Sequence, residues 1–541
     1  MVDRPRISRL STKSMSLLPT VSNLAPGSTT DPTTAVNYEN VNLEIQSVHV
    51  PSPPILQLEA ATINSEIDIT GINQLSLLPT KFHLQPLISD ENTTCADIYP
   101  NSNDLGATVY RKQCIDISKS NDNVLFHQKL KHFFIFSVAG KPIYSLHGND
   151  DLTMGYMGIL TTILSTFQED LDQDVHVIEL GSNRVKLVVL NRSPIVLIAI
   201  SKLPHETEQF LTRQLIVLYK YLLSILSKQT IDRVFHNRLN YDLRRVLSPL
   251  DMENLDSLCM KLTFGLQHDG LNSFLGELFT ARPSLRIPYT LRKKMDRFLK
   301  EQQEEEEDLL FAILSKDNQV TNFVHPKIHT LTNEDLYLLT FIVHSLKNKS
   351  EDLWIPLCMP NFNQNGYLYI FLRSWRQLTL ILVSGSKNAF DKLKVIADRI
   401  IQRAETSQAG HFLENLEQAL MKPIRNEVPL VIKHFVYVNK EINQCVISEI
   451  NDDSDDLKLQ LVVYYSLLKQ CKSQLEADEI KNGYKKLSYM RWNSSTAFML
   501  SGTSFEFYCV AGDGVDSKNL IEICLKIVNW CKKNKNRLFS T

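Results

Sequence analysis

Residues 133–144 read FFIFSVAGKPIY, and this stretch decides the fold. The apolar run 133–136 has the length of a β-strand, Ala139-Gly140-Lys141 predicts a tight turn, and residues 142–144 return as a second strand. From Asp151 the apolar period becomes helical, and three strand-like runs (175–180, 185–190 and 195–200) and a second helix follow. The first helix carries one stripe of apolar residues: Leu152, Tyr156, Ile159, Leu160, Ile163 and Phe167.

The same order of elements occurs twice more along the chain. A hairpin at 309–314 and 320–324 precedes a helix that begins at Thr332, three strands between 354 and 383, and a helix over 388–403. A third hairpin at 431–438 and 444–447 precedes a helix over 456–475, three strands between 486 and 510, and a final helix. Because the three copies share one pattern, we predict an α/β chain of separate α+β two-layer domains. Their predicted bounds are 125–248, 309–405 and 430–541.

The remaining segments are predicted to be a tail and two connectors. Residues 1–124 contain ten of the 21 prolines, no Trp and a single Phe, so we predict a mostly disordered regulatory tail. Its many Ser and Thr residues could serve kinases, and a passive tail is the alternative. Residues 249–308 form a predicted helical connector that ends in a basic stretch and an acidic run at 304–308. This end is interpreted as a solvated linker helix or as an acidic patch for a partner. Residues 406–429 form the second connector.

Composition excludes several classes of function. The 58 Lys and Arg residues nearly balance 60 Asp and Glu residues, which disfavours a nucleic-acid-binding protein. No run of about 18 apolar residues predicts a membrane-spanning helix. The nine cysteines include no CxxC pair, which favours free thiols in the cytosol. We find no phosphate-binding loop, nucleophile elbow or zinc motif, and therefore expect no catalytic residue, cofactor or metal. The sequence predicts a binding protein.

Three features suggest interaction surfaces. Within the helix from Asp151, a second stripe (Met154, Met157, Thr161 and Leu164) and the glycines Gly155 and Gly158 predict a face that meets another protein; a helix fully buried under the connector is the alternative. The segment Asn240-Tyr241-Asp242-Leu243-Arg244-Arg245 predicts a second contact surface, with local ion pairing as the alternative. The third feature is a basic chain end with one aromatic residue: Trp530, Lys532, Lys533, Lys535 and Arg537. It predicts contact with an anionic membrane, and the alternative is that the cations only interact favourably with the dipole at the C-terminal end of the last helix.

Short sequence motifs between about Lys131 and the C-terminus are distinctive when taken together. They are Lys131-His132-Phe133-Phe134, Ala139-Gly140-Lys141-Pro142-Ile143-Tyr144, Met157-Gly158, Asn191-Arg192-Ser193-Pro194-Ile195-Val196-Leu197, 240–245, Pro360-Asn361-Phe362-Asn363, Gly366-Tyr367-Leu368, His434-Phe435-Val436-Tyr437 and Phe505-Glu506-Phe507-Tyr508-Cys509. Together these motifs resemble the monensin-sensitivity family of vacuolar fusion proteins. After Ser145 this chain reads Leu146-His147-Gly148 where the family usually has Arg-Tyr-Gly, and Asn443-Gln444-Cys445-Val446 lacks the family's Ser-Pro ending.

The resemblance implies three longin domains, each a five-stranded, mostly antiparallel sheet with flanking helices. It also implies a heterodimer with the calcium-caffeine-zinc-sensitivity longin subunit, which acts as guanine-nucleotide exchange factor for the late-endosomal and vacuolar Rab GTPase. The first longin domains of the two subunits are expected to pair and to present the GTPase platform. The expected location is the cytosol, peripherally on phosphoinositide-bearing membranes of late endosomes, multivesicular bodies and vacuoles. The alternatives are a longin scaffold or tethering subunit without exchange activity, or a subunit of the sister exchange complex of lysosome-related organelles.

From the resemblance and the residues together, we expect GTPase or partner contacts at Met154, Met157, Gly158, Thr161, Asn240, Asp242, Arg244 and Arg245. Nucleotide exchange requires differential affinity for the nucleotide-free GTPase and no covalent chemistry.

Overall fold

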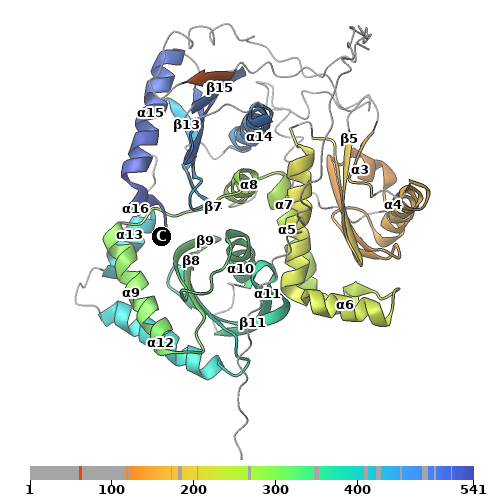
Figure 1. Ribbon diagram of the computed structural model, residues 1–541, viewed down its shortest axis with the longest axis horizontal. Coiled ribbons are helices and arrows are strands. Elements are labelled where there is room, and N and C mark those ends of the chain that lie inside the picture. Colours follow the sequence, from red (N-terminus) through yellow and green to blue (C-terminus); the bar gives the residue numbers. More distant parts are fainter. Residues whose placement is uncertain are drawn as a thin grey trace, which may run out of the picture. The chain divides into compact units, whose positions relative to one another are not determined.

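Three β-sheets carry the architecture of the computed structural model (Figure 1). The structure describes residues 60–63, 117, 119, 121–171, 174–180, 185–203, 205–265, 270–346, 352–406, 412–421, 428–450, 454–477, 485–492, 495–512 and 515–540. Most of the predicted tail 1–124 lies outside these residues. One part of that tail is a strand, β1 (Ala60–Ile63), which adds antiparallel to the edge strand β15 (Lys485–Trp492) of the third sheet.

The first domain contains the hairpin predicted from residues 133–144. Its sheet has the order β3-β2-β6-β5-β4, and every neighbouring pair is antiparallel. Side chains alternate along the central strand, so that Phe134 and Phe136 face one layer while Phe133 and Ile135 face the other. The elements are α3 (Asn123–Gln128), β2 (Lys131–Ser137), β3 (Pro142–Ser145), α4 (Asp150–Leu171), β4 (Val177–Leu180), β5 (Val185–Arg192), β6 (Ile195–Ser201) and α5 (Glu208–Leu226).

The second domain repeats this topology with the strand order β9-β8-β12-β11-β10, again antiparallel throughout. Its first helix begins after Thr332, whose hydroxyl accepts a hydrogen bond from the N–H of Asp335, as the capping pattern predicts. The elements are β8 (Phe311–Lys316), β9 (Gln319–Val324), α10 (Asn333–Leu346), β10 (Leu353–Met359), α11 (Pro360–Asn363), β11 (Gln364–Trp375), β12 (Leu378–Ser384), α12 (Phe390–Thr406) and α13 (Phe412–Met421).

The third domain has the same core order, β14-β13-β17-β16-β15, extended by β1 at one edge and by the two-residue strand β7 (Arg282–Pro283) at the other. The predicted α/β class, with three mostly antiparallel sheets, is confirmed. The elements are β13 (Ile432–Asn439), β14 (Gln444–Ile447), α14 (Asp455–Ala477), β15, β16 (Ser495–Ser501), β17 (Phe505–Gly512), α15 (Ser517–Lys533) and α16 (Lys535–Leu538).

The connector between the first two domains is helical but is not a solvated linker. After α6 (Lys228–Asn237) and a short 3₁₀ turn, η2 (Leu243–Val246), it forms α7 (Pro249–Thr263), α8 (Gly270–Phe279) and α9 (Tyr289–Glu305). Helix α9 buries Met295 and Leu299 against the second sheet, because its apolar side chains recur on one face. The acidic run forms ion pairs with α12, for example Asp308 with Lys392 at 2.5 Å. Hence the connector is not a solvated linker helix, whereas the acidic patch for a partner stays a prediction, because Glu304, Glu305 and Glu307 are exposed.

One core joins the connector to all three domains. Side chains of α5, α7, α8, α10 and α14 form a single apolar cluster with one face of each sheet. Among the described residues no single helix is long and apolar enough to cross a membrane. Helices α5 and α6 pass that test of length and composition only together, and they are bent by 81° at their junction.

Candidate functional site

Helix α4 has one buried face and one exposed apolar face. The side-chain amide oxygen of Asn149 accepts a hydrogen bond from the N–H of Leu152 at 3.0 Å, which starts the helix. Met157 (0% exposed) and Leu160 pack on the sheet with Phe134 and Phe136. The opposite face leaves Met154 48% and Ile159 59% exposed. An exposed apolar face of this kind is a candidate protein contact.

The two glycines of α4 lie on this exposed face. A Cβ atom at Gly155 or at Gly158 would meet nothing within 4 Å. The fold itself therefore does not require glycine at either position, although each lowers helix propensity by about 1 kcal/mol relative to alanine. Absence of a side chain there lets another backbone approach the helix closely. We define the α4 face as Met154, Gly155, Gly158, Ile159 and Thr162, all exposed.

The structure corrects two residues of the predicted stripe. Met157 is fully buried, so its side chain belongs to the domain's own core and is not available to a partner. Thr161 is half-buried; its hydroxyl donates to the Met157 carbonyl at 2.7 Å, and it lines a groove of about 200 Å³ beside the sheet. Conversely Ile159, assigned from sequence to the other stripe, is exposed. The error is one of angle, because successive helical residues are separated by about 100° and both stripes were apolar.

The equivalent helices of the other two domains are covered. Helix α10 buries side chains around most of its circumference, and α14 buries Leu461, Tyr464 and Leu468 in the same core. In the first domain the connector packs instead against α5, on the other side of the sheet. Figure 1 shows α4 on the outer side of that sheet, with α5 on the inner side. Of these three helices α4 alone leaves an apolar face uncovered within the described part of the chain.

The segment 240–245 lies beside the start of α4. The Arg244 guanidinium forms an ion pair with Asp150 in the first turn of the helix, with Nη1 2.8 Å from Oδ2. The Lys141 ammonium, in the first hairpin, donates to the Asn240 carbonyl at 3.3 Å. The second predicted contact feature, although far away in sequence, therefore lies next to the N-terminal end of the helix that carries the first.

Asp242 and Arg244 hold this segment in shape. Asp242 caps η2 by accepting from the N–H of Arg244 at 3.2 Å, and its carboxylate also accepts from the Arg244 guanidinium at 3.1 and 3.3 Å. Burial acts to raise the pKa of Asp242, but the hydrogen bonds and charge of Arg244 outweigh it and the pKa is lowered. The alternative of local ion pairing thus explains Asp242 and Arg244, whereas Asn240 and Arg245 project their side chains to the surface.

Comparison with known proteins identifies the domains. The family models of the first, second and third longin domains of FUZ, MON1 and HPS1 match residues 131–258, 307–402 and 431–535. The chain is 42% identical to the vacuolar fusion protein MON1 of Candida albicans, over 99% of each chain. The chain belongs to the MON1 family. It is also similar to the MON1 proteins of Yarrowia lipolytica (32% identical, over 76% of this chain and 74% of the relative) and Saccharomyces cerevisiae (29%, over 78% and 73%).

Within this MON1-family fold, the basic residues predicted to meet a membrane cluster at the end of the third longin domain. Four of the five have contacts within their own chain. Trp530 lies under the Arg286 guanidinium, the Lys532 ammonium stands 4.2 Å from the Phe505 ring centroid, and the Lys535 ammonium forms an ion pair with Glu441 at 2.7 Å. Arg537 bonds to Asn534 in the same turn at 3.5 Å, and Lys533 is exposed. These contacts order the chain end and leave the membrane role a prediction.

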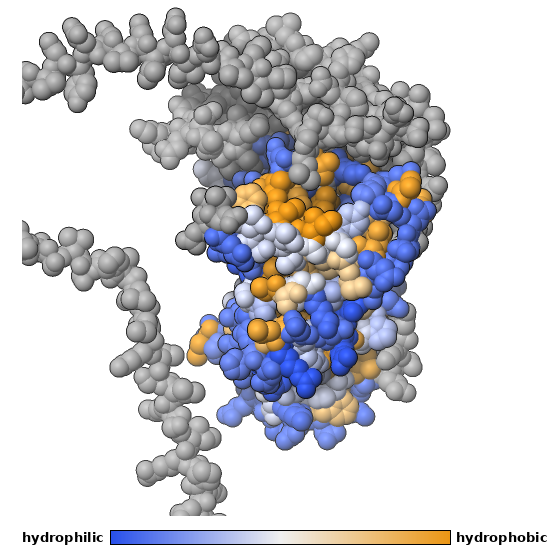
Figure 2. All heavy atoms as spheres, turned by 90° about the vertical axis from the view of Figure 1, so that its right-hand side faces the viewer, coloured by the Kyte–Doolittle hydropathy of each residue, from blue (hydrophilic) through white to orange (hydrophobic). Residues whose placement is uncertain are grey.

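Sequence reasoning missed Ile159 and Thr162 of the α4 face, which are exposed. The signal that could have found them was the pair Gly155 and Gly158. Residues at i, i+3, i+4 and i+7 from a glycine share its face, and 159 and 162 stand at those positions. Figure 2 views the side of the molecule on which α4 lies and shows hydrophobic surface gathered beside largely hydrophilic surface.

Proposed function

We propose that this chain is one subunit of a heterodimeric guanine-nucleotide exchange factor that activates the late-endosomal and vacuolar Rab GTPase, and so promotes endosome maturation and vacuole fusion. Its partner is the calcium-caffeine-zinc-sensitivity longin subunit. Membership of the MON1 family and the names of the relatives as vacuolar fusion proteins support this role. The observation that carries it is the α4 face, an apolar helix surface that the described residues leave uncovered while they cover both equivalent helices.

The α4 face fits a second longin domain. Met154 and Ile159 supply apolar contact area, and the two open glycines allow a partner backbone to come close. Fully buried contacts at the centre of an interface usually carry most of its binding energy. We therefore assign the α4 face to the longin partner and the exposed Asn240 and Arg245 to the GTPase. The Arg244–Asp150 ion pair, at the N-terminal end of α4, supports a position of the second surface close to the first.

Exchange at such a surface needs no acid, base or nucleophile from this chain. A factor that binds the nucleotide-free GTPase more tightly than the nucleotide-bound form weakens nucleotide binding by the same factor and so favours release. Arg245 is suited to the role, because an exposed guanidinium can pair with acidic or phosphate-binding parts of a GTPase. The complex acts peripherally at phosphoinositide-bearing membranes, and the basic chain end at Lys533 is one candidate contact.

Two substitutions separate the two surfaces. Ile159→Arg is expected to abolish copurification of the longin partner, because a charge would be buried at the centre of the interface. Arg245→Glu is expected to leave the heterodimer intact and to slow nucleotide release from the Rab protein about tenfold or more. Ile328→Arg, at an 87% exposed residue of the second domain, is the matched control.

The readouts are pull-down of the partner and release of a fluorescent guanine nucleotide from a panel of Rab proteins. Heterodimer formation without acceleration for any Rab would show a scaffold instead of an exchange factor. Acceleration of a Rab of lysosome-related organelles alone would favour the sister complex. If Ile159→Arg behaves as Ile328→Arg does, the α4 face is not the interface.

A further inference from the structure

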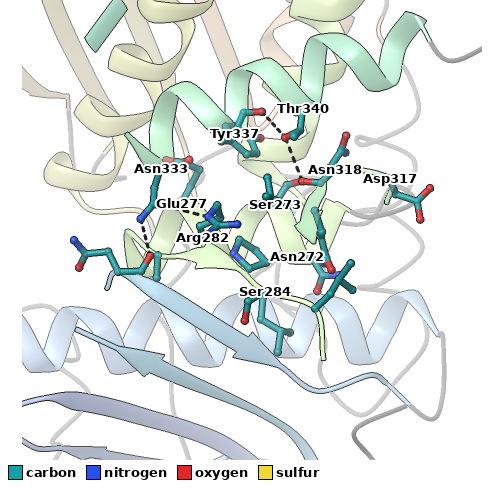
Figure 3. A pocket seen from close by; sticks show the side chains of 18 of the residues that line it. Asn272, Ser273, Glu277, Arg282, Ser284, Asp317, Asn318, Asn333, Tyr337 and Thr340 are labelled. Carbon is teal, nitrogen blue, oxygen red and sulfur yellow. Dashed lines mark hydrogen bonds between the residues drawn. The ribbon is translucent and has the colours of Figure 1, made fainter. Parts of the chain in front are cut away.

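A polar cavity of about 630 Å³ lies where the connector meets the second and third longin domains. Its walls come from α5, α8, β7, the turn between β8 and β9, α10 and the residues around β14. Figure 3 shows Arg282 among the side chains that line it, close to Glu277 and Asn333. Neither the contacts of the α4 face nor those of residues 240–245 involve this cavity.

Arg282 brings an uncompensated positive charge to the cavity wall. Its side chain is 9% exposed; Nε donates to the Asn333 side-chain oxygen at 3.1 Å and Nη2 to the Ser540 hydroxyl at 2.8 Å. Nη1 is buried and has no hydrogen-bond partner, and Arg282 forms no ion pair within the described residues. Buried charges in proteins are normally paired, so a missing anion is the simplest completion of this group.

A second buried arginine strengthens the positive field. Arg292 is 3% exposed and stands behind the cavity wall, where Nη2 donates to the carbonyl of the lining residue Leu285 at 2.7 Å. Its Nε and Nη1 atoms have no hydrogen-bond partner among the described residues, although the carboxylate of Asp296 is near enough to offset part of its charge. Burial and the charge of Arg292 lower the pKa of Arg282 to about 10, which leaves both guanidinium groups charged at neutral pH.

The carboxylates that line the cavity do not neutralise Arg282. Glu277 is bonded to Arg213 at 3.0 Å, and Glu334 forms ion pairs with Lys220 and Arg213. Asp317 and Glu449 also line the cavity. The carboxylates of Glu277 and Glu334 are therefore paired with cations of α5. Arg282 of β7 has no ion pair among the described residues.

Polar groups on another wall could bind the body of a ligand. The side-chain amide of Asn318, in the turn between β8 and β9, has no hydrogen-bond partner for its nitrogen or its oxygen among the described residues. Such an amide offers two N–H donors and one acceptor oxygen to hydroxyl groups or to a second amide. The cavity thus presents a cationic end at Arg282 and a neutral hydrogen-bonding end at Asn318.

We infer that this cavity binds a small molecule that carries a phosphate monoester, with the phosphate on Arg282 and a hydroxylated body at Asn318. A phosphate monoester carries about −1.5 to −2 charges at pH 7 and would supply the counter-charge that Arg282 lacks, and guanidinium is well shaped for phosphate oxygens. The phosphate belongs either to a soluble metabolite or to a lipid headgroup. Because the cavity walls come from several domains, its occupant ties those domains together.

The test uses the full chain, alone and copurified with its longin partner. Inorganic phosphate and glycerol 3-phosphate are the soluble probes, and vesicles of phosphatidylcholine with phosphatidylinositol 3-phosphate are the lipid probe. A saturating soluble probe is expected to raise the Tm by about 2 °C or more. Arg282→Gln is expected to weaken that binding at least about tenfold without lowering the Tm of the unliganded chain, because the substitution removes an unpaired buried charge.

Arg399→Gln, at an exposed arginine of α12, is the control and should behave as wild type. Asn318→Ala should weaken the binding of glycerol 3-phosphate more than the binding of inorganic phosphate. This variant also tests the proposal if Arg282→Gln does not fold. Vesicle flotation that depends on Arg282, without a thermal shift by soluble probes, assigns the phosphate to a lipid headgroup. The proposal is overturned if no probe binds the wild-type chain, or if neither Arg282→Gln nor Asn318→Ala weakens the binding of any probe.

Discussion

At the scale of single residues, the first longin domain depends on a fully buried ion pair. The Lys131 ammonium lies 2.5 Å from the Glu206 carboxylate, and both side chains are 0% exposed. Glu206 also accepts from the Ser201 hydroxyl at 2.5 Å and the Gln214 amide at 3.1 Å. Lys131 opens the phrase that resembles the family, yet sequence alone does not reveal this pair, because its partner is 75 residues away.

Lys131→Met is predicted to lower the free energy of unfolding by about 3–5 kcal/mol, because Glu206 is left buried without a counter-charge. The double variant Lys131→Met, Glu206→Leu should recover much of that loss. Lys228→Met breaks an exposed pair with Asp232 on α6 and should cost no more than about 1 kcal/mol. Urea denaturation of the four proteins measures these differences; equal losses in the single and double variants would contradict the prediction.

The pair also predicts how stability changes in acid. Burial pushes the pKa of Glu206 upward, but the charge of Lys131, followed by that of His205, outweighs it, so the folded pKa lies below the ordinary value of 4.5. A carboxyl with a depressed folded pKa contributes stability above its unfolded pKa and loses it as pH falls through the folded value. Wild type should therefore lose stability below about pH 4.5 more steeply than the double variant in denaturation at a series of pH values.

At the scale of elements, the strands were predictable and the outward face of α4 was not. The hairpin at residues 133–144 forms as predicted because a glycine turn with positive φ at Gly140 joins two apolar runs. Periodicity also located α4, since its apolar residues recur at helical spacing. It could not decide that Met157 points inward and Ile159 outward, because both residues are apolar and only the packed sheet distinguishes them. Asn240 and Arg245 were predicted as a contact surface, but their position beside α4 depends on the Arg244–Asp150 pair.

Replacing a glycine of the α4 face is predicted to have opposite effects on the stability of the chain and on partner binding. Gly158→Ala should stabilise the isolated chain by about 1 kcal/mol, since the helix gains propensity and the new methyl group meets open space. The same methyl group should weaken binding of the longin partner by holding its backbone away. Thermal unfolding and pull-down measure the two effects. Gly276→Ala is the contrast: its Cβ would stand 3.0 Å from Pro283, so it should destabilise the chain instead. Tighter partner binding by Gly158→Ala would count against the α4 face.

At the scale of the whole molecule, the connector unites the domains. Phe274 of α8 is 0% exposed and makes an edge-on contact with Phe210 of α5 in the first domain, with ring centroids 5.4 Å apart. Helix α8 also packs against α14 of the third domain. Charge patterning could not predict this burial, because the charged end of the connector in α9 is the part that sequence shows most plainly.

Phe274→Ala is therefore predicted to destabilise more than one domain at once. Truncation of a buried Phe costs about 3–5 kcal/mol, and here the cavity opens between α5, α8 and the third domain. Hydrogen exchange should accelerate in α5 and α14 together. Phe371→Ala removes an equally buried ring whose apolar neighbours belong to the second domain and to α9. Exchange in that variant should accelerate mainly around β11 and α12. If the two variants give the same pattern of exchange, α8 does not couple the first and third domains, because the loss would then spread through the whole core wherever a ring is removed.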